Sequence, residues 1–267
     1  MYDFHLRTAG KSTNGETRMA DRITSNQNPL LRHIRKLQTS RAYREECGEF
    51  VCDGFKLLDE ALKWYPHLKT VIAAEGAQLP PLPPDVRAVE IPASLMQSLS
   101  SMKTPQGVIF TCSLPERGAP QIRGGTLLLD RVQDPGNLGT ILRTADAFGV
   151  PVLLTNGCAD PYSEKTLRAS MGAVLRTAPQ SAELSEILNA CKERGIRITA
   201  TALSERATDL RQTQIGDDLV VIGSEGQGIC RELLDASDRQ VIIPMQPRCE
   251  SLNAAVAAAL VMWNMKY

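Results

Sequence analysis

Residues 127–149 read LLLDRVQDPGNLGTILRTADAFG, and this stretch decides the fold expected for the second half of the chain. Its apolar start, 127–129, is typical of a buried parallel strand, and the Asp, Pro, Gly and Asn residues of 130–139 predict a loop. From Ile141 the apolar residues recur at helical spacing, which predicts a helix that ends at Gly149. In open α/β sheets, ligands bind at the carboxyl ends of such strands, so this loop is a candidate site.

Two polar residues of this stretch are functional candidates. Asn137 lies in the polar loop, and Arg143 points away from the apolar face of the expected helix. The same residues are explained equally well if Asn137 caps the helix and Arg143 is a solvated surface cation. The stretch alone leaves both interpretations open.

The composition is that of a soluble globular protein. The 267 residues are 43% hydrophobic, and 30 basic residues balance 30 acidic ones, so a basic surface for nucleic acid can only be local. The seven cysteines form no C-x-x-C pair, which predicts free thiols in a reducing cytosol. The apolar stretch 254–263 is too short to span a membrane, and the amino terminus lacks a signal-peptide core, so we expect a cytoplasmic protein.

The amino-terminal residues divide into a polar tail and a basic segment. Residues 1–21 are rich in Gly, Ser, Thr and Asn and are predicted to form a disordered tail, with Met19 as an alternative start. Residues 22–44 contain no acid, and their apolar residues lie at a helical spacing that leaves the cations outside. These cations suit contacts with phosphate, although a solvated charged face has the same pattern; they are Arg22, Arg32, Arg35, Lys36, Arg41 and Arg44.

Strands and helices are expected to alternate along the rest of the chain. A small α/β domain is predicted for 22–115, with strands at 50–52, 70–74, 86–91 and 108–111 and helices at 55–64 and 94–99. Pro, Gly and charged residues mark 116–125 as a linker. A parallel-sheet α/β domain is predicted for 126–267, with later strands at 152–154, 196–202, 219–222 and 241–243 and helices at 163–170, 183–194, 231–236 and 251–265.

Three loops of the second domain carry polar residues suited to chemistry. They are 130–139, GSEGQG at 223–228 and PMQPRCESLN at 244–253, and each follows an apolar strand, so parallel strands should bring them to one edge. The glycines let backbone N–H groups approach a ligand, and Glu225 adds a carboxylate. Ser251 stands at the head of the last expected helix and is first explained as its N-cap.

Several common kinds of site are excluded. The dinucleotide fingerprint G-x-G-x-x-G and the phosphate loop G-x-x-x-x-G-K-[ST] are both missing. The three histidines, His5, His33 and His67, lie in the first half, so neither a Ser-His-Asp triad nor a histidine-ligated metal fits the second domain. We therefore expect no metal site there.

Three motifs, DRVQDPGNLGTILRTADAFGV, VIGSEGQGI and IIPMQPRCESLNAAVAAAL, resemble the ordered motifs of the SpoU/TrmH branch of the SPOUT RNA methyltransferases. SMGAVLR at 170–176 extends the likeness, and RITSNQNPLLRHIRKL and REECGEFVCDGFKLLDEAL resemble the family's RNA-binding domain. The resemblance implies S-adenosylmethionine-dependent methylation of a ribose 2′-hydroxyl in ribosomal or transfer RNA. It also implies a deep trefoil knot in the carboxyl-terminal domain, a homodimer, and RNA binding by residues 22–115.

The resemblance also implies roles for individual residues. It places the cofactor on Gly223, Ile243, Met245, Ser251, Leu252 and Asn253, and it makes Arg143, Asn137, Glu225 and Ser251 the catalytic set. For Arg143 two roles are open: a base, or a cation that holds the adjacent phosphate and stabilises a developing alkoxide. A guanidinium keeps its proton at physiological pH, so we favour the second role.

One position departs from the family pattern. Pro247 stands where members usually have glycine, and Arg248 and Cys249 follow it. Proline lacks an N–H and fixes φ, which puts the geometry of the cofactor loop, and hence cofactor affinity, in question. Arg248 offers an additional RNA phosphate contact.

Two other functions remain open at this point. The first is a non-catalytic RNA-binding protein that kept this fold, and the joint retention of Asn137, Arg143, Glu225 and Ser251 argues against it. The second is a nucleotide-dependent oxidoreductase, which the missing dinucleotide fingerprint disfavours.

Overall fold

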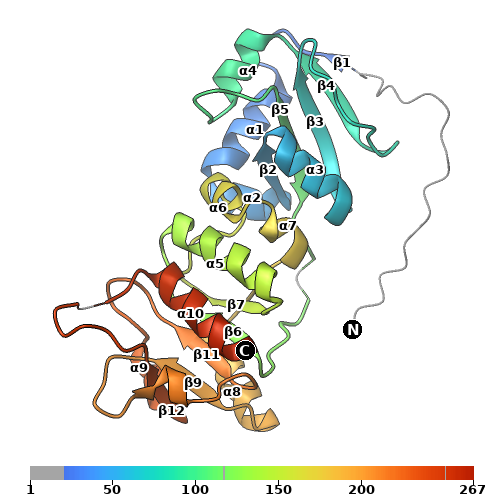
Figure 1. The fold of residues 1–267 in the computed structure, drawn as a ribbon. Coiled ribbons are helices and arrows are strands. Elements are labelled where there is room, and N and C mark those ends of the chain that lie inside the picture. The colour runs from blue at the N-terminus through green and yellow to red at the C-terminus, as the bar shows by residue number, and fades with distance from the viewer. Residues whose placement is uncertain (1–20, 117, 250) are drawn as a thin grey trace.

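The computed structural model describes residues 21–116, 118–249 and 251–267, which form two sheets with helices on their faces (Figure 1). The disordered tail expected at 1–21 lies outside the described residues, except for Asp21, which is paired in a strand. The described part of the linker expected at 116–125 contains neither helix nor strand. Among the described residues, no helix is long and apolar enough to cross a membrane.

The amino-terminal sheet has five strands in the order β1-β4-β3-β5-β2. β1 and β3 run parallel to β4, whereas β5 runs antiparallel to β2 and β3. Alternation along β2 sends Phe50 to the face covered by α3 and Val51 to the face covered by α1 and α4. The elements are β1 (Asp21–Arg22), α1 (Pro29–Thr39), α2 (Arg41–Cys47), β2 (Glu49–Asp53), α3 (Phe55–Trp64), β3 (Leu68–Ala74), β4 (Arg87–Ile91), α4 (Ala93–Leu99) and β5 (Val108–Ser113).

The basic segment 22–44 contributes to two helices. Leu31, Ile34 and Leu37 are buried along α1, as their spacing predicted. Ser40 ends α1 and caps α2, because its side chain accepts a hydrogen bond from Tyr43 N at 3.2 Å. The break turns α2 away from α1 and toward the second half of the molecule.

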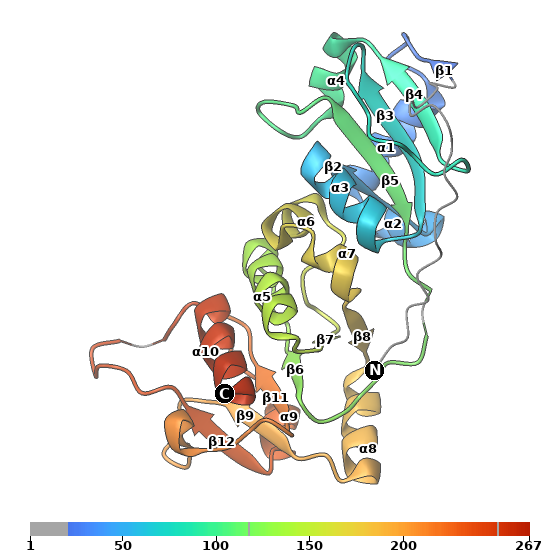
Figure 2. The same cartoon turned by 45° about the vertical axis from the view of Figure 1, so that its right-hand side comes forward.

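The carboxyl-terminal sheet has seven strands in the order β10-β12-β9-β11-β6-β7-β8, and every pair is parallel, as predicted. The face covered by α5, α6, α7 and α10 lies opposite the face covered by α8 and α9 (Figure 2). The short elements β8, β10, α7 and η1 were not expected. The elements are β6 (Thr126–Leu129), α5 (Pro135–Phe148), β7 (Val152–Thr155), α6 (Glu164–Ser170), α7 (Ala173–Thr177), β8 (Gln180–Ala182), α8 (Leu184–Arg194), β9 (Ile198–Thr201), β10 (Thr208–Asp209), η1 (Leu210–Gln212), β11 (Leu219–Ile222), α9 (Arg231–Asp235), β12 (Arg239–Ile242) and α10 (Ala254–Lys266).

α5 begins earlier than the apolar spacing indicated, at Pro135 rather than Ile141. Asp134 caps it, because Asp134 Oδ1 accepts a hydrogen bond from Asn137 N at 2.7 Å. The interpretation of Asn137 as the cap is therefore wrong. Gly139 lets α5 lie directly on α6, since a Cβ there would stand 2.7 Å from a carbonyl oxygen of α6.

α10 begins after Ser251 rather than at it, so the interpretation of Ser251 as the N-cap is also wrong. The cap is Asn253, whose Oδ1 accepts hydrogen bonds from the N–H groups of Ala255 at 2.9 Å and Val256 at 3.3 Å. From this start α10 runs beside α5 (Figures 1 and 2). The deep trefoil knot implied for this segment stays a prediction.

The two sheets are joined by a contact that we call the seam. It is formed by α2, β2 and α3 on the amino-terminal side and by residues 158–163, α6 and α7 on the other. Its apolar part is aromatic: the rings of Phe50 and Tyr162 lie 4.8 Å apart, and Tyr65 packs edge-on against Phe50 at 5.7 Å. Both sides thus share one continuous core.

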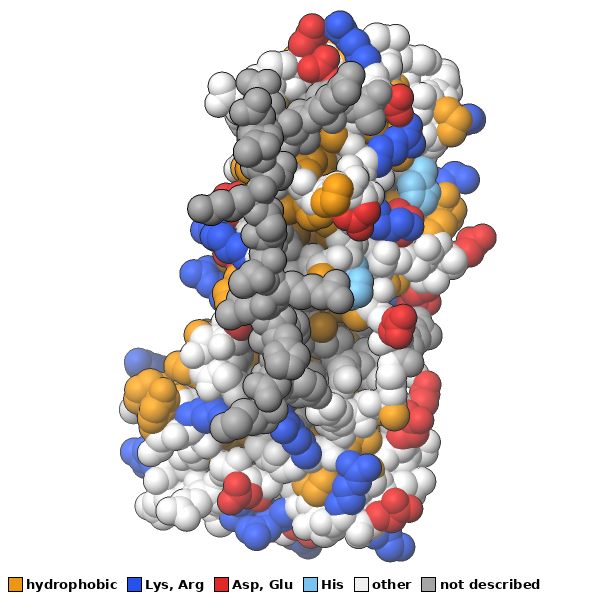
Figure 3. Space-filling view, turned by 90° about the vertical axis from the view of Figure 1, so that its right-hand side faces the viewer, with side chains coloured by type: hydrophobic (Ala, Val, Ile, Leu, Met, Phe, Trp, Pro, Cys, Tyr) orange, Lys and Arg blue, Asp and Glu red, His pale blue; other side chains and the backbone are white. Residues whose placement is uncertain are grey.

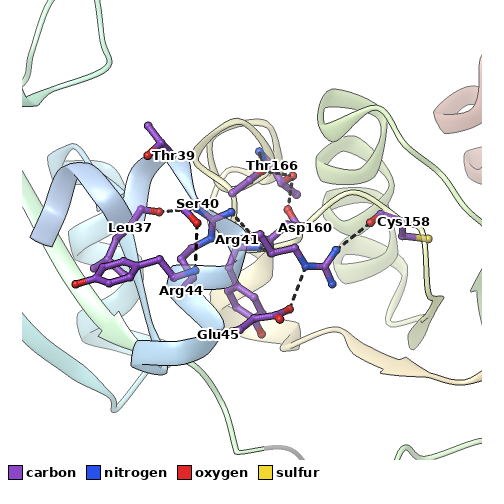
Figure 4. A network of polar contacts seen from close by, with 12 residues as sticks. Leu37, Thr39, Ser40, Arg41, Arg44, Glu45, Cys158, Asp160 and Thr166 are labelled. Carbon is purple, nitrogen blue, oxygen red and sulfur yellow. Dashed lines mark hydrogen bonds and ion pairs between the residues drawn. The ribbon is translucent and has the colours of Figure 1, made fainter.

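The polar part of the seam includes ion pairs, and Figure 4 shows the one between Arg44 and Asp160. Arg44, whose side chain is 6% exposed, donates to Asp160 Oδ2 from Nε at 2.8 Å and from Nη2 at 2.5 Å. Arg176 lies between Glu60 and Asp146, with 2.8 Å to the latter. The expectation that all six cations of 22–44 face solvent is therefore wrong for Arg44, because a partner across the seam draws it inward.

Candidate active site

Side chains from three loops meet at the carboxyl edge of the second sheet. Asn253 Nδ2 donates to Asn137 Oδ1 at 2.9 Å, and Asn137 Nδ2 donates to Glu225 Oε1 at 2.7 Å. We call these three residues the amide–carboxylate chain. Parallel strands predicted that the loops after β6, β11 and β12 would converge, and these contacts confirm it.

Each member of this chain is held by its own local structure. Asn137 lies in the first turn of α5 behind its cap, and Asn253 is itself the cap of α10. Glu225 lies in a tight turn that closes with two backbone hydrogen bonds between Ser224 and Gly228, at 3.1 and 3.0 Å. The groups are positioned by backbone geometry before any ligand binds.

Gly223 is required by this turn. A Cβ at residue 223 would lie 2.2 Å from the carbonyl carbon of Gly228, which no side chain can tolerate. Gly223 does not line the pocket described next, so its predicted contact with a cofactor stays a prediction.

A pocket opens beside the amide–carboxylate chain, with about 510 Å³ of space that is partly open to solvent. Four of the predicted cofactor residues, Ile243, Met245, Ser251 and Leu252, lie in its wall, and Asn253 follows directly. The remaining lining residues were not predicted; they are Thr201, Ala202, Leu203, Val241, Ile242 and Ala257. The end of β9 is therefore a wall that sequence reasoning missed.

The walls of the pocket are formed mainly by apolar side chains. Large apolar side chains stand exposed at it, with Leu203 62% and Leu252 37% accessible. Mainly apolar walls with a few polar groups are typical of ligand pockets. Ser251 and Thr201 add hydroxyl groups to the lining, and the Thr201 hydroxyl already donates to Val221 O at 2.8 Å.

Pro247 is compatible with the loop that carries it. Cys249 N donates to Gln246 O at 2.8 Å, which closes a four-residue turn with Pro247 in its second position. Proline is favoured in that position because its fixed φ suits the turn. The departure from the family pattern therefore leads to an ordinary turn.

Arg143 is not part of the amide–carboxylate chain. It is exposed on α5 and, within the described residues, makes no hydrogen bond or ion pair. Helix geometry places it about 9 Å along the axis and about 120° around it from Asn137. One copy of the protein thus brings Asn137 to Glu225, whereas Arg143 lies on another face of α5.

The basic segment 22–44 is distributed over several surroundings. Arg32 and Lys36 are exposed on α1, and Arg35 donates to Asn26. The others have partners: Arg22 pairs with Glu75, Arg41 donates to Cys158 O, and Arg44 is buried in the seam. Among the described residues visible in Figure 3, acidic and basic side chains are interspersed.

Two family models match the chain. The SpoU rRNA Methylase family covers residues 125–263, and the MRM3-like substrate binding domain covers residues 28–109. A relative named 23S rRNA (guanosine(2553)-2′-O)-methyltransferase RlmP, from Bacillus subtilis, is 31% identical over 246 residues, which are 91% of this chain and 98% of that protein.

Solved structures give the same result. The AdoMet-bound rRNA methyltransferase from Sinorhizobium meliloti aligns with a TM-score of 0.79 at 28% identity, over 91% of this chain and 96% of that one. A structure described as an RNA 2′-O ribose methyltransferase aligns with a TM-score of 0.74 at 29% identity, over 91% and 97%. Alignments that cover 91% of the chain include both of its units.

Proposed function

The chain belongs to the SpoU rRNA methylase family, and we propose that its amide–carboxylate chain organises the reaction site. The protein is an RNA 2′-O-ribose methyltransferase that uses S-adenosylmethionine. The observation that supports the location of its site is the hydrogen-bonded contact of Asn137 with Glu225 and Asn253, next in sequence to the pocket residues Ser251 and Leu252.

The pocket residues suit S-adenosylmethionine. Leu203, Met245 and Leu252 offer apolar surface to an adenine, and the backbone of 243–245 offers polar groups to its edge. The cofactor supplies an electrophilic methyl group when it is bound. The protein's own residues then have to hold the ribose and help to remove the proton of its 2′-hydroxyl.

We assign these two tasks to different residues. Glu225 Oε1 already accepts from Asn137, which leaves Oε2 free to accept a hydrogen bond from the 2′-hydroxyl. Arg143 holds the neighbouring phosphate and stabilises the developing alkoxide as a permanent cation. If so, Arg143→Lys keeps more activity than Arg143→Ala in single-turnover assays at several pH values. Full activity in Arg143→Ala would exclude both the base and the stabiliser.

A second copy of the chain is expected to cover one face of α10. Val256, Leu260, Trp263 and Tyr267 form an exposed apolar stripe along this helix, and Phe148 of α5 packs against Trp263 at 5.9 Å. A contiguous apolar stripe of this kind marks a protein interface. Trp263→Glu should give a monomer in light scattering, whereas an unchanged mass would refute this interface.

We place RNA binding on the amino-terminal unit and the reaction in the cytoplasm. Arg32, Arg35 and Lys36 are the cations of α1 available to phosphate, and Arg44 is excluded because it is buried. Among the described residues all seven cysteines are free, which fits a reducing compartment.

The direct test is methyl transfer. Labelled S-adenosylmethionine and ribosomal RNA are incubated with the protein, and 2′-O-methyl sites are mapped in RNA from cells with and without the gene. We expect one site to depend on the gene and to be methylated in vitro. RNA binding without transfer to any RNA would instead support the non-catalytic alternative.

A further inference from the structure

Arg131 follows β6, the neighbour of the middle strand β11, in an unusual backbone conformation. Its φ is 54°, in the left-handed region that residues other than glycine seldom adopt. Backbone strain of this kind persists where the surrounding structure uses it. Gly157 makes room for the side chain, since a Cβ there would lie 3.1 Å from Arg131 Cγ.

The Arg131 guanidinium reaches the turn that carries Glu225. Its Nη1 donates to Gln227 Oε1 at 3.1 Å, and its Nη2 lies 3.5 Å from Gly228 O. Nε and Nη2 also bind the two carboxylate oxygens of Asp130, at 3.1 and 3.2 Å. A planar guanidinium is suited to hold several oxygens in fixed directions at once.

Asp130 holds the strand ends on both sides of the same turn. Its side chain is 3% exposed, and its Oδ2 accepts from Cys230 N at 2.7 Å, just after the turn. Its backbone N donates to Ile222 O at 2.8 Å, just before the turn. Asp130 therefore binds the residues on both sides of the turn 223–228, and Arg131 binds Gln227 and Gly228 within it.

We propose that Arg131 is a positioning residue for the methyl-transfer reaction, which acts by fixing the turn 223–228 so that Glu225 meets Asn137. The turn is closed by its own hydrogen bonds, so fixing Gln227 and Gly228 also fixes Glu225. The inference rests on the proposed function. It adds a residue that touches neither the pocket nor the amide–carboxylate chain.

Two substitutions separate the side chain from the backbone. Arg131→Gly removes the guanidinium and relieves the left-handed φ, whereas Arg131→Ala removes the guanidinium and keeps the strain. We expect both variants to lose single-turnover methyl transfer by about 10-fold to 100-fold, since small misplacements of reacting groups have effects of this size. Arg131→Lys should recover part of the rate. Arg211→Ala, which removes an arginine paired with Asp209, is the matched control and should leave the rate unchanged.

A second readout does not depend on activity. Hydrogen exchange in the free protein should become faster at the backbone amides of 224–230 in Arg131→Gly, while 135–148 exchanges as in the wild type. Gln227→Ala should reproduce this pattern. Combined with Glu225→Gln, Arg131→Gly should add little further loss of rate, because both changes act through the same carboxylate.

Three results would overturn the proposal. They are a wild-type rate in Arg131→Gly, unchanged exchange at 224–230, or fully additive losses with Glu225→Gln. A wild-type protein that methylates no RNA would refute the proposed function instead, and the exchange measurement would still decide whether Arg131 fixes the turn.

Discussion

The seam and the amide–carboxylate chain lie at opposite ends of α5 and are built in opposite ways. Near the end of α5, Asp146 joins Arg176 in a seam of buried and half-buried charges and closely packed aromatic rings. At its start, Asn137 is half-exposed and makes one hydrogen bond to each of two exposed side chains, Glu225 and Asn253. Ion pairs and packed rings thus join the two units firmly, whereas two hydrogen bonds near solvent connect the residues of the reaction site.

This difference teaches where substitutions should act. A buried charge that loses its partner stays buried, so breaking the seam should destabilise the fold. A single amide hydrogen bond near solvent contributes only about 1 kcal/mol net to folding. Removing a hydrogen bond of the amide–carboxylate chain should therefore mainly affect the reaction. The measurements below test this division, beginning with the largest effect.

The largest effect is expected from Arg44→Ala. It leaves Asp160 uncompensated inside the seam, so the free energy of unfolding should fall by about 3–5 kcal/mol in urea titrations. Arg41→Ala is the control on the same helix, because Arg41 is exposed and makes a long 3.4 Å contact across the seam. The double variant Arg44→Met/Asp160→Leu should regain most of the loss. A change below about 1 kcal/mol in Arg44→Ala would mean that the seam is no firmer than the site.

Asn137→Ala tests the other region. It removes both hydrogen bonds that join the three loops, and the single-turnover rate should fall on the order of 100-fold to 1,000-fold. The free energy of unfolding should change by less than about 1 kcal/mol. Thr140→Ala, on the next turn of α5, is the control and should change neither quantity much. A large loss of stability in Asn137→Ala would show that the site also carries the fold.

Replacing Arg32, Arg35 and Lys36 by Gln tests whether a change in the amino-terminal unit affects RNA binding alone or also reaches the cofactor site across the seam. RNA affinity should fall, and the slope of log affinity against log salt should become shallower by about 2–3, near 0.7–0.9 for each lost phosphate contact. The rate at saturating RNA and the affinity for S-adenosylmethionine should not change. The same substitutions at Lys192, Arg211 and Arg231 control for net charge. Loss of cofactor binding in the first variant would indicate a structural role instead.

The smallest effect concerns a weak point within the seam. Asp53 is largely buried, its Oδ1 has no hydrogen-bond partner within the described residues, and burial raises its pKa from the usual 3.8. Its protonated form therefore stabilises the fold below pH 3.8, and this contribution is lost as pH rises through the raised pKa. Asp53→Asn should increase the free energy of unfolding at pH 7 and match the wild type at pH 3. Asp59→Asn, at an exposed site on α3, should show no such trend.

The sequence predicted the site better than the seam for a physical reason. Asn137 and Glu225 follow apolar strands, and parallel strands must end at one edge, so their meeting can be derived from local patterns. Arg44 meets Asp160, which lies 116 residues away, and nothing in the local run of cations separates a buried arginine from an exposed one. An ion pair between distant segments leaves no periodic pattern in the sequence, so local sequence patterns cannot predict it.

The helix starts were predicted wrongly for a related reason. Asp134 and Pro135 are a standard cap and first residue, yet among the Pro, Gly and Asn of 130–139 they also read as loop. At α10, Ser251 and Asn253 are both good caps, and only the contact of Asn253 with the other loops distinguishes them. Capping chemistry limits the start of a helix to a few residues, and tertiary contacts select among them.

The double use of Asn253 gives the amide–carboxylate chain a direction. Because its oxygen is occupied by the start of α10, its amide nitrogen is the group that must face Asn137. Asn137 must then present its oxygen to Asn253 and its nitrogen to Glu225. Both amide donors of the amide–carboxylate chain therefore point toward Glu225. Asn253→Asp would keep the helix start and remove the first donor, which would reverse the orientation of Asn137 and set two acceptors against each other at Glu225.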